Sequence, residues 1–169
     1  NARIAASFTL RVPACPLGCV IMDRTQANSG TAAVSDRLRF DVAALEAWMA
    51  DHVPGFTGPL SVSQFKGGQS NPTYRLDTPA KDGQAPRAFV LRRKPPGTLL
   101  PGAHAVEREA RVMSALGPAG FPVPRVHGLC EDPAIIGTPF FVMDLIEGRI
   151  IWEAAFPGLL PDRRGAHFD

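Results

Sequence analysis

The order of extended and helical segments restricts the fold of this chain more strongly than any other feature of its sequence. Five segments carry the apolar pattern of strands: residues 60–65, 73–76, 88–93, 126–130 and 139–146. A helical apolar pattern over residues 103–116 separates the third of these segments from the fourth. This order predicts an α+β domain with a five-stranded, mostly antiparallel sheet and one packed helix.

A second helix is predicted before the sheet. Asp41 is a suitable N-cap, and apolar residues follow it at helical spacing as far as Met49. Residues 23–37 are polar and have no period, and we expect Met22 to be the natural start. The predicted organisation is a disordered or non-native leader over residues 1–37, one domain over residues 38–150, and the start of a second lobe over residues 151–169.

The composition argues against several classes of partner. The 169 residues include 18 basic and 16 acidic side chains, and this formal net charge of +2 gives no electrostatic support for binding nucleic acid or an anionic membrane. No run approaches the roughly 18 consecutive apolar residues that a membrane-spanning helix needs. The three cysteines have the spacing of neither a disulfide framework nor a zinc site. We therefore expect a cytoplasmic protein.

A glycine-containing loop, residues 67–71, connects the first two predicted strands. A dinucleotide-binding fold places its glycines directly before a helix, so this position argues against that fold. Glycines would let backbone N–H groups approach phosphate oxygens, and Ser70 would add a hydroxyl donor. The same residue types are ordinary turn formers. Taken alone, the loop is more simply a hairpin turn than a phosphate site.

The helix predicted over residues 103–116 carries an acidic residue within its apolar stripe. Val106, Glu109 and Met113 share one face at helical spacing. A carboxylate that faces a core is costly unless a cation meets it, so Glu109 requires a basic partner. Glu107 and Arg108 fall on other faces, and we expect them to be solvated.

The third predicted strand offers that partner. Alternation along the strand puts Val90, Arg92 and Lys94 on one face. Arg92 held by Glu109 would supply a fixed cation for the phosphate oxygens of a nucleotide. A purely structural ion pair fits the same pattern equally well. Lys94 lies beside two prolines, and we expect its side chain to be exposed.

Several motifs in a fixed order resemble the N-terminal lobe of the aminoglycoside-phosphotransferase family. The resemblance extends over about residues 40–164 and is carried by RAFVLRRKPPG at 87–97, HAVEREARVM at 104–113, FPVPRV at 121–126 and GTPFFVMDLIEGR at 137–149. GGQSNPTY at 67–74 and KPPGTLLPGAH at 94–104 resemble most closely the kinase domains fused to acyl-CoA dehydrogenases and their free-standing bacterial relatives. The resemblance implies a protein-kinase-like N-terminal lobe that uses ATP and Mg²⁺.

The resemblance also implies roles for individual residues. Arg92 would contact the α and β phosphates, with Glu109 as its helix partner, and Val90 would cover the adenine. The loop over the phosphates would comprise Gly67, Gly68, Gln69, Ser70 and Asn71. The backbone of Asp144, Leu145 and Ile146 would be the hinge that hydrogen-bonds the adenine edge.

The sequence departs from the family pattern in one important respect. It contains no His-Gly-Asp followed by Asn, and no later magnesium-binding aspartate in the family's context. We therefore expect Mg²⁺ to be bound through a missing C-terminal lobe, and the chain to be an inactive fragment of a phosphotransferase that acts on an alcohol group. The small-molecule hydroxyl substrate, with hydroxyacyl-CoA as a candidate, would be a partner only of the full-length protein.

Two alternatives to an enzyme fragment stay open. One is a non-catalytic kinase-like module that binds a nucleotide or a partner, and the other is a structural α+β domain without a ligand. A module that functions alone should have a polar surface where the second lobe would pack. The sequence instead has apolar residues there, through which we expect self-association: Ile150, Ile151, Trp152, Phe156, Leu159 and Leu160.

Overall fold

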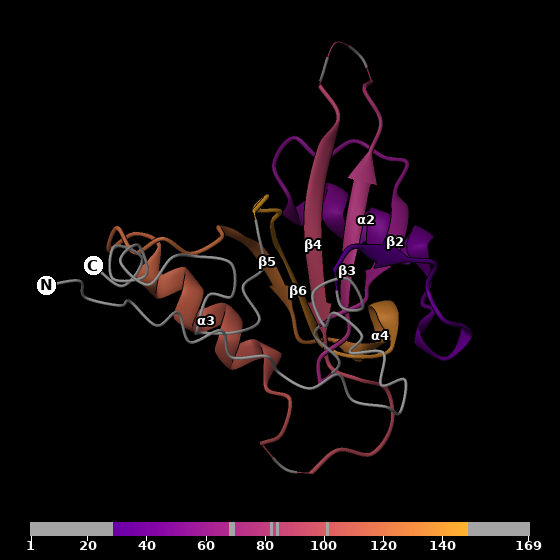
Figure 1. Cartoon of the computed structure of the whole chain (residues 1–169), viewed down its shortest axis with the longest axis vertical. Coiled ribbons are helices and arrows are strands. Elements are labelled where there is room, and N and C mark those ends of the chain that lie inside the picture. Colours follow the sequence, from indigo (N-terminus) through magenta and orange to yellow (C-terminus); the bar gives the residue numbers. More distant parts are fainter. Residues whose placement is uncertain (1–28, 68–69, 82, 84, 101, 149–169) are drawn as a thin grey trace, which may run out of the picture.

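The computed structural model describes residues 29–67, 70–81, 83, 85–100 and 102–148, which form one sheet with helices on its two faces (Figure 1). Six antiparallel strands lie in the order β1-β2-β3-β4-β6-β5. Their bounds are β1 (Thr31–Ala32), β2 (Ser61–Phe65), β3 (Thr73–Thr78), β4 (Arg87–Arg93), β5 (Val126–Cys130) and β6 (Phe140–Asp144). The helices are the 3-10 helix η1 (Asp36–Leu38), α2 (Val42–His52), α3 (Val106–Leu116) and α4 (Pro133–Ile136). The predicted α+β class and antiparallel sheet are confirmed.

The sheet has one strand more than predicted, and this strand lies before the expected start of the domain. Thr31 pairs with Phe65 and Ala32 pairs with Gln64. The backbone N–H of Ser35 donates to the side-chain oxygen of Gln64 at 3.4 Å. A two-residue strand is too short to show a period in the sequence, so pairing with a neighbour is what reveals it.

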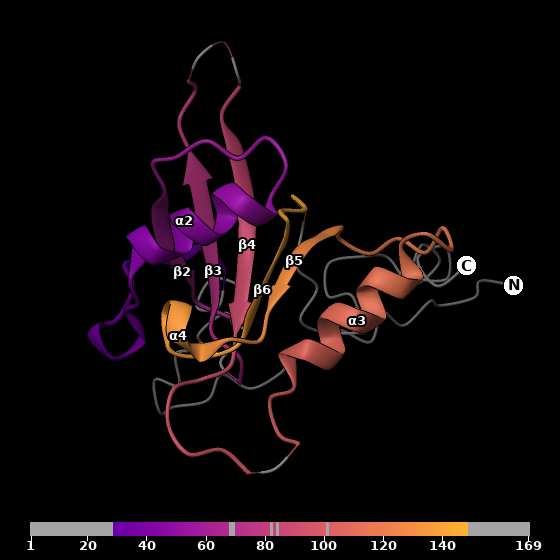
Figure 2. The ribbon, with the colours of Figure 1, turned by 180° about the vertical axis from the view of Figure 1, so that it is seen from behind.

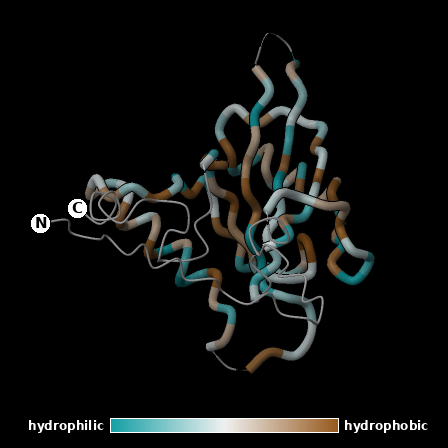
Figure 3. The backbone as a smooth tube through the Cα atoms, in the orientation of Figure 1, coloured by the Kyte–Doolittle hydropathy of each residue, from teal (hydrophilic) through white to brown (hydrophobic). Residues whose placement is uncertain are grey.

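Helix α2 covers one face of the sheet, as Figure 2 shows from behind. Its predicted N-cap is confirmed, because the Asp41 carboxylate accepts a hydrogen bond from the N–H of Ala44 at 3.0 Å. Leu45, Trp48 and Met49 pack against the apolar side chains of the central strands. In Figure 3, brown colour along the central strands marks the hydrophobic residues of the sheet. The main core therefore lies between α2 and the sheet.

Tyr74 joins this core to the chain segment before α2. Its side chain is fully buried, and its hydroxyl donates to the carbonyl of Leu38 at 2.9 Å. Burial raises the pKa of Tyr74, although the nearby positive charge of Arg93 opposes the shift. The phenol therefore stays a neutral hydrogen-bond donor near neutral pH.

Helix α3 packs on the opposite face, near the edge formed by β5 and β6 (Figure 1). Val106 and Ala110 are buried against Phe141 of β6, in a cluster separate from the main core. The helix begins at Val106 rather than at residue 103. Gly102 and His104 have φ angles of 75° and 57°, which a right-handed helix does not contain. The residues just before α3 thus form a turn that sets the angle of the helix.

The segment between β5 and β6 also differs from the prediction. No helix is predicted between residues 130 and 139, but α4 begins at Pro133. The Asp132 carboxylate caps this short helix by accepting from the N–H of Ala134 at 2.8 Å. Among the described residues, no helix is long and apolar enough to cross a membrane.

Candidate functional site

The predicted contact between strand β4 and helix α3 is present. The Nε atom of Arg92 lies 2.7 Å from Oε2 of Glu109, and the two side chains are 27% and 38% exposed. The Arg92 Nη1 group also donates to the hydroxyl of Thr73 at 3.3 Å. Within the described part of the chain, the Nε–H of Arg92 makes no hydrogen bond of good geometry, so its contact with Glu109 is mainly one of charge.

Asn71 reaches the second oxygen of the same carboxylate. Its Nδ2 group donates to Oε1 of Glu109 at 3.0 Å. Its Oδ1 atom lies 2.9 Å from Nδ1 of His104. The Asn71 side chain is only 4% exposed, although the residue ends a loop. The last residue of the glycine loop is therefore part of the polar group around Arg92 and Glu109.

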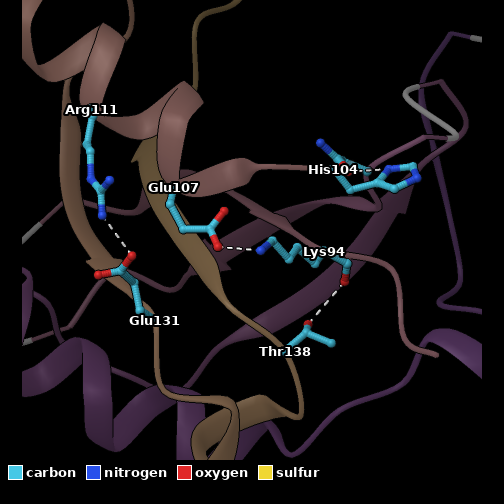
Figure 4. A network of polar contacts seen from close by, with 7 residues as sticks. Lys94, His104, Glu107, Arg111, Glu131 and Thr138 are labelled. Atoms are coloured by element: carbon cyan, nitrogen blue, oxygen red, sulfur yellow. Dashed lines mark hydrogen bonds and ion pairs between the residues drawn. The ribbon is translucent and has the colours of Figure 1, made fainter. Parts of the chain in front are cut away.

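A second ion pair corrects two of the sequence expectations. Lys94 was expected to be exposed and Glu107 to be solvated, but the two half-buried side chains contact each other (Figure 4). The hydroxyl of Thr138 donates to the backbone carbonyl of Lys94 at 3.1 Å, and the side chain of Lys94 points toward Glu107 on α3. Helical periodicity alone did not indicate this contact, because Glu107 lies outside the apolar stripe.

The Lys94 contact changes the acidity of Glu107. Burial by itself would raise the pKa of this carboxyl. The hydrogen bond from Lys94 and the charges of Lys94 and Arg111 outweigh that effect, so the pKa of Glu107 is lowered. Both Glu107 and Glu109 lie in the first turn of α3, where the helix dipole also favours negative charge.

Val90 lies on the same sheet face as Arg92, as predicted, and only 6% of it is exposed. It pairs in register with Arg75 on β3. The guanidinium of Arg75 is held by the carboxylate of Asp77 at 2.9 Å. On the sheet face next to Arg92, the apolar side chain of Val90 therefore lies beside the ion-paired side chain of Arg75.

The three predicted hinge residues lie at the end of β6, whose last residue is Asp144. The N–H of Asp144 donates to the carbonyl of Arg125 at 2.9 Å, so this amide is already used. The Asp144 carboxylate lies 2.6 Å from Nε2 of His127, whose side chain is almost fully buried. In the described segments, neither Leu145 nor Ile146 donates a backbone hydrogen bond, and Ile146 is exposed. Within residues 29–148 as described, neither amide therefore has a backbone partner that a ligand would have to displace.

The glycine loop is described only in part. Gly67 and the exposed Ser70 belong to the described residues, whereas Gly68 and Gln69 lie outside them. An open cavity of about 320 Å³ lies beside this loop, and its lining includes Lys66, Gly67 and Thr73. No residue of β4 or α3 lines it, so it is not the cleft predicted for a nucleotide.

The sequence analysis missed three residues of this site. His104, Thr73 and Lys94 each contact a predicted site residue or its neighbour on α3. The only signal in the sequence for His104 was its place within a motif, because a histidine in a loop has no period to interpret. In the described ranges, no three His, Cys, Asp or Glu side chains lie together in a group that could hold a metal ion.

Comparison with known proteins agrees with this geometry. Residues 61–169, more than half of the chain, match the family model described as the phosphotransferase enzyme family, APH. The chain is similar to acyl-CoA dehydrogenase family member 11 of Rattus norvegicus, with 43% identity over 80% of this chain and 17% of the relative. It is also similar to acyl-CoA dehydrogenase family member 10 of Mus musculus, with 54% identity over 65% of this chain and 10% of the relative.

A solved structure supports the same assignment. A Ralstonia eutropha protein named as an aminoglycoside phosphotransferase is 47% identical, with a TM-score of 0.62 over 78% of this chain and 35% of that one. The chain thus spans about a third of the solved relative, and 17% or less of the two acyl-CoA dehydrogenase relatives above. The resemblance inferred from the motifs is confirmed, and the chain belongs to the phosphotransferase enzyme family.

Proposed function

We propose that this chain is the nucleotide-binding lobe of an ATP-dependent phosphotransferase whose acceptor is a hydroxyl group of a small molecule. The observation that carries this proposal is the fixed position of Arg92, which is held by Glu109 and Thr73. An arginine fixed in this way keeps other N–H groups available for phosphate oxygens. Phosphoryl transfer depends mainly on such positioning and charge neutralisation.

The proposed nucleotide site also includes Val90, which lies on the same sheet face as Arg92. Val90 would cover the adenine, and the backbone amides of Leu145 and Ile146 would meet its edge. The backbone of residues 67–71 would cover the phosphates, as N–H groups of glycine loops do. The described residues offer no group for Mg²⁺, so we do not assign the metal to their side chains.

The acceptor is proposed from the relatives alone. Two relatives are named as acyl-CoA dehydrogenase family members, which favours a hydroxyacyl-CoA as the small molecule. A second candidate function is the binding of a nucleotide or a partner without phosphate transfer, for which the fixed position of Arg92 would serve equally well.

Two further proposals concern the surroundings of the protein. We propose a cytoplasmic location, which the spacing of the cysteines favours. We also keep the proposal of self-association through the apolar residues between 150 and 160, which lie outside the described residues.

Titration of the full chain with ATP, followed by calorimetry, tests the nucleotide proposal. Arg92→Ala should weaken binding by about tenfold or more, because a hydrogen bond to a charged group contributes about 1.5–3 kcal/mol. Arg111→Ala is the matched control, since Arg111 is exposed and pairs with Glu131 rather than with a residue of the proposed site. Thermal unfolding of each variant checks that the fold is intact. Equal affinities of the wild type and Arg92→Ala would contradict the proposal.

A further inference from the structure

The side chain of Asn71 is oriented by its two neighbours. The carboxylate of Glu109 can only accept hydrogen bonds, so the Asn71 atom that faces it at 3.0 Å must be the amide nitrogen. The amide oxygen of Asn71 then faces His104. An amide oxygen can only accept, so Nδ1 of His104 must carry a proton. The contacts therefore fix the orientation of Asn71 and the protonated nitrogen of His104 together.

Asn71 also donates a well-aligned hydrogen bond to the Glu109 carboxylate, which the Nε–H of Arg92 does not do in the described part of the chain. Arg92 lies close to Oε2 of Glu109, but its Nε–H makes no hydrogen bond of good geometry among the described residues. A charge contact sets the separation of two groups more strongly than their orientation, whereas a hydrogen bond requires alignment. In this part of the chain, Asn71 is the residue that donates a hydrogen bond to the Glu109 side chain.

The backbone holds His104 in an uncommon conformation that presents its ring to Asn71. Its φ angle of 57° is the only positive one among the described residues other than glycine. Its carbonyl accepts a hydrogen bond from the N–H of Val106 at 2.8 Å, at the start of α3. Histidine, like Asn and Asp, adopts this left-handed conformation more often than most residues other than glycine. The turn brings the ring of His104, which is labelled in Figure 4, to the side chain of Asn71.

We propose that Asn71 and His104 are positioning residues that join the glycine loop to the ion pair of Arg92 and Glu109. His104 orients the amide of Asn71, and Asn71 orients the carboxylate that holds Arg92. The last residue of the loop and the start of α3 are then linked through one buried side chain. This inference rests on the proposed nucleotide function of Arg92.

One test is independent of any nucleotide. NMR spectra that correlate the ring nitrogens and carbons of ¹⁵N-labelled full-length chain report which nitrogen of His104 carries the proton. We expect a protonated Nδ1 at neutral pH, and Asn71→Ala should release this preference. A neutral ring protonated only at Nε2 in the wild type would overturn the proposal, whatever the affinity for ATP.

A second test separates the hydrogen bond from the backbone conformation at residue 104. His104→Asn keeps a side-chain N–H near the position of Nδ1 and tolerates a positive φ, whereas His104→Gly keeps only the conformation. We expect His104→Asn to retain most of the ATP affinity and His104→Gly to lose about three- to tenfold, as expected for one hydrogen bond. Equal affinities of the two variants, at matched melting temperatures, would overturn the role of His104.

The role of Asn71 is tested in the same titration. Asn71→Asp removes the donor and places a second negative charge beside Glu109, so affinity should fall by about tenfold or more. An unchanged affinity would overturn the proposal for Asn71. Failure of the wild type to bind ATP would overturn the nucleotide function and the positioning role together, while the protonation of His104 would still report on the hydrogen bond. If the Asn71 variants do not fold, the two His104 variants decide the question.

Discussion

Lys94 and Glu107 form an ion pair beside the pair of Arg92 and Glu109, so two cations at the end of β4 meet two carboxylates in the first turn of α3. Lys94 follows Arg92 by two residues, and Glu107 precedes Glu109 by two residues. The side chains of the Lys94 pair are the more buried of the two pairs. The start of α3 is therefore attached to the sheet by two contacts rather than by the single contact that the sequence predicted.

Arg92 and Glu109 should act together in nucleotide binding. Arg92→Ala and Glu109→Ala should each weaken ATP binding, and their effects should deviate from additivity by at least about 0.5 kcal/mol, as expected for groups in contact. Calorimetric titration of the two single variants and the double variant measures this coupling. The same cycle with Arg111 and Glu131, an exposed pair, should give additive and small effects. Additive effects for Arg92 and Glu109 would mean that their contact is not part of the nucleotide site.

Glu107 should make stability depend on pH in the acid range. Its pKa is lower in the folded chain than the ordinary value of 4.5, so its ionised form stabilises the fold fully above that value. This contribution is lost as the pH falls from 4.5 through the lower folded pKa. The difference in unfolding free energy between the wild type and Glu107→Gln should therefore shrink on acidification. Urea unfolding at a series of pH values measures it.

Glu131→Gln is the control for this pH series. Glu131 belongs to an exposed ion pair with Arg111, and such pairs contribute about 0–1 kcal/mol. The unfolding free energy of Glu131→Gln should therefore differ little from that of the wild type at every pH of the series. If Glu107→Gln differs from the wild type by the same amount at every pH, the Lys94 contact does not lower the pKa of Glu107 in solution.

Gly128 should not tolerate a methyl group. A Cβ atom at this position would lie 2.8 Å from Cη2 of Trp48. Trp48 cannot easily retreat, because its ring stacks on His52 and packs edge-on against Phe140. Gly128→Ala should therefore destabilise the fold by about 1–3 kcal/mol, as overpacking does, which thermal unfolding would measure. Gly117→Ala is the matched control, since its nearest contact would be 3.5 Å and its φ is −55°. Similar melting temperatures for both variants would contradict this account of the packing.

Residues 29–37 should contribute to stability. A chain that begins at residue 38 should be less stable than one that begins at residue 29, by about 1 kcal/mol or more. The shorter chain lacks the pairing of Thr31 with Phe65, the contact of Ser35 with Gln64, and the packing of Val34 on the core. Denaturant unfolding of the two chains tests this. Equal stabilities would mean that β1 adds nothing to the sheet.

The sequence alone determined the order of the five longer strands and of helices α2 and α3, and the identity of the main ion pair. Strand alternation placed Arg92 beside Val90, and helical periodicity placed Glu109 in an apolar stripe that required a cation. Both inferences rely on the periodicity of residue types within one segment, which can be seen without knowing which segments pack against it. The motifs then identified the family, because several of them occur in the right order.

Tertiary structure decided the rest, because those contacts join residues with no shared period. Lys94 meets Glu107 on α3, while Thr138 on a distant segment hydrogen-bonds to the backbone of Lys94. Asn71 meets Glu109 and His104 across sequence separations of 38 and 33 residues. Such contacts depend on where β4 and α3 lie relative to the glycine loop, and a pattern within any one segment holds no information about that placement. The sequence alone therefore determined which residues could act, and packing determined which of them act together.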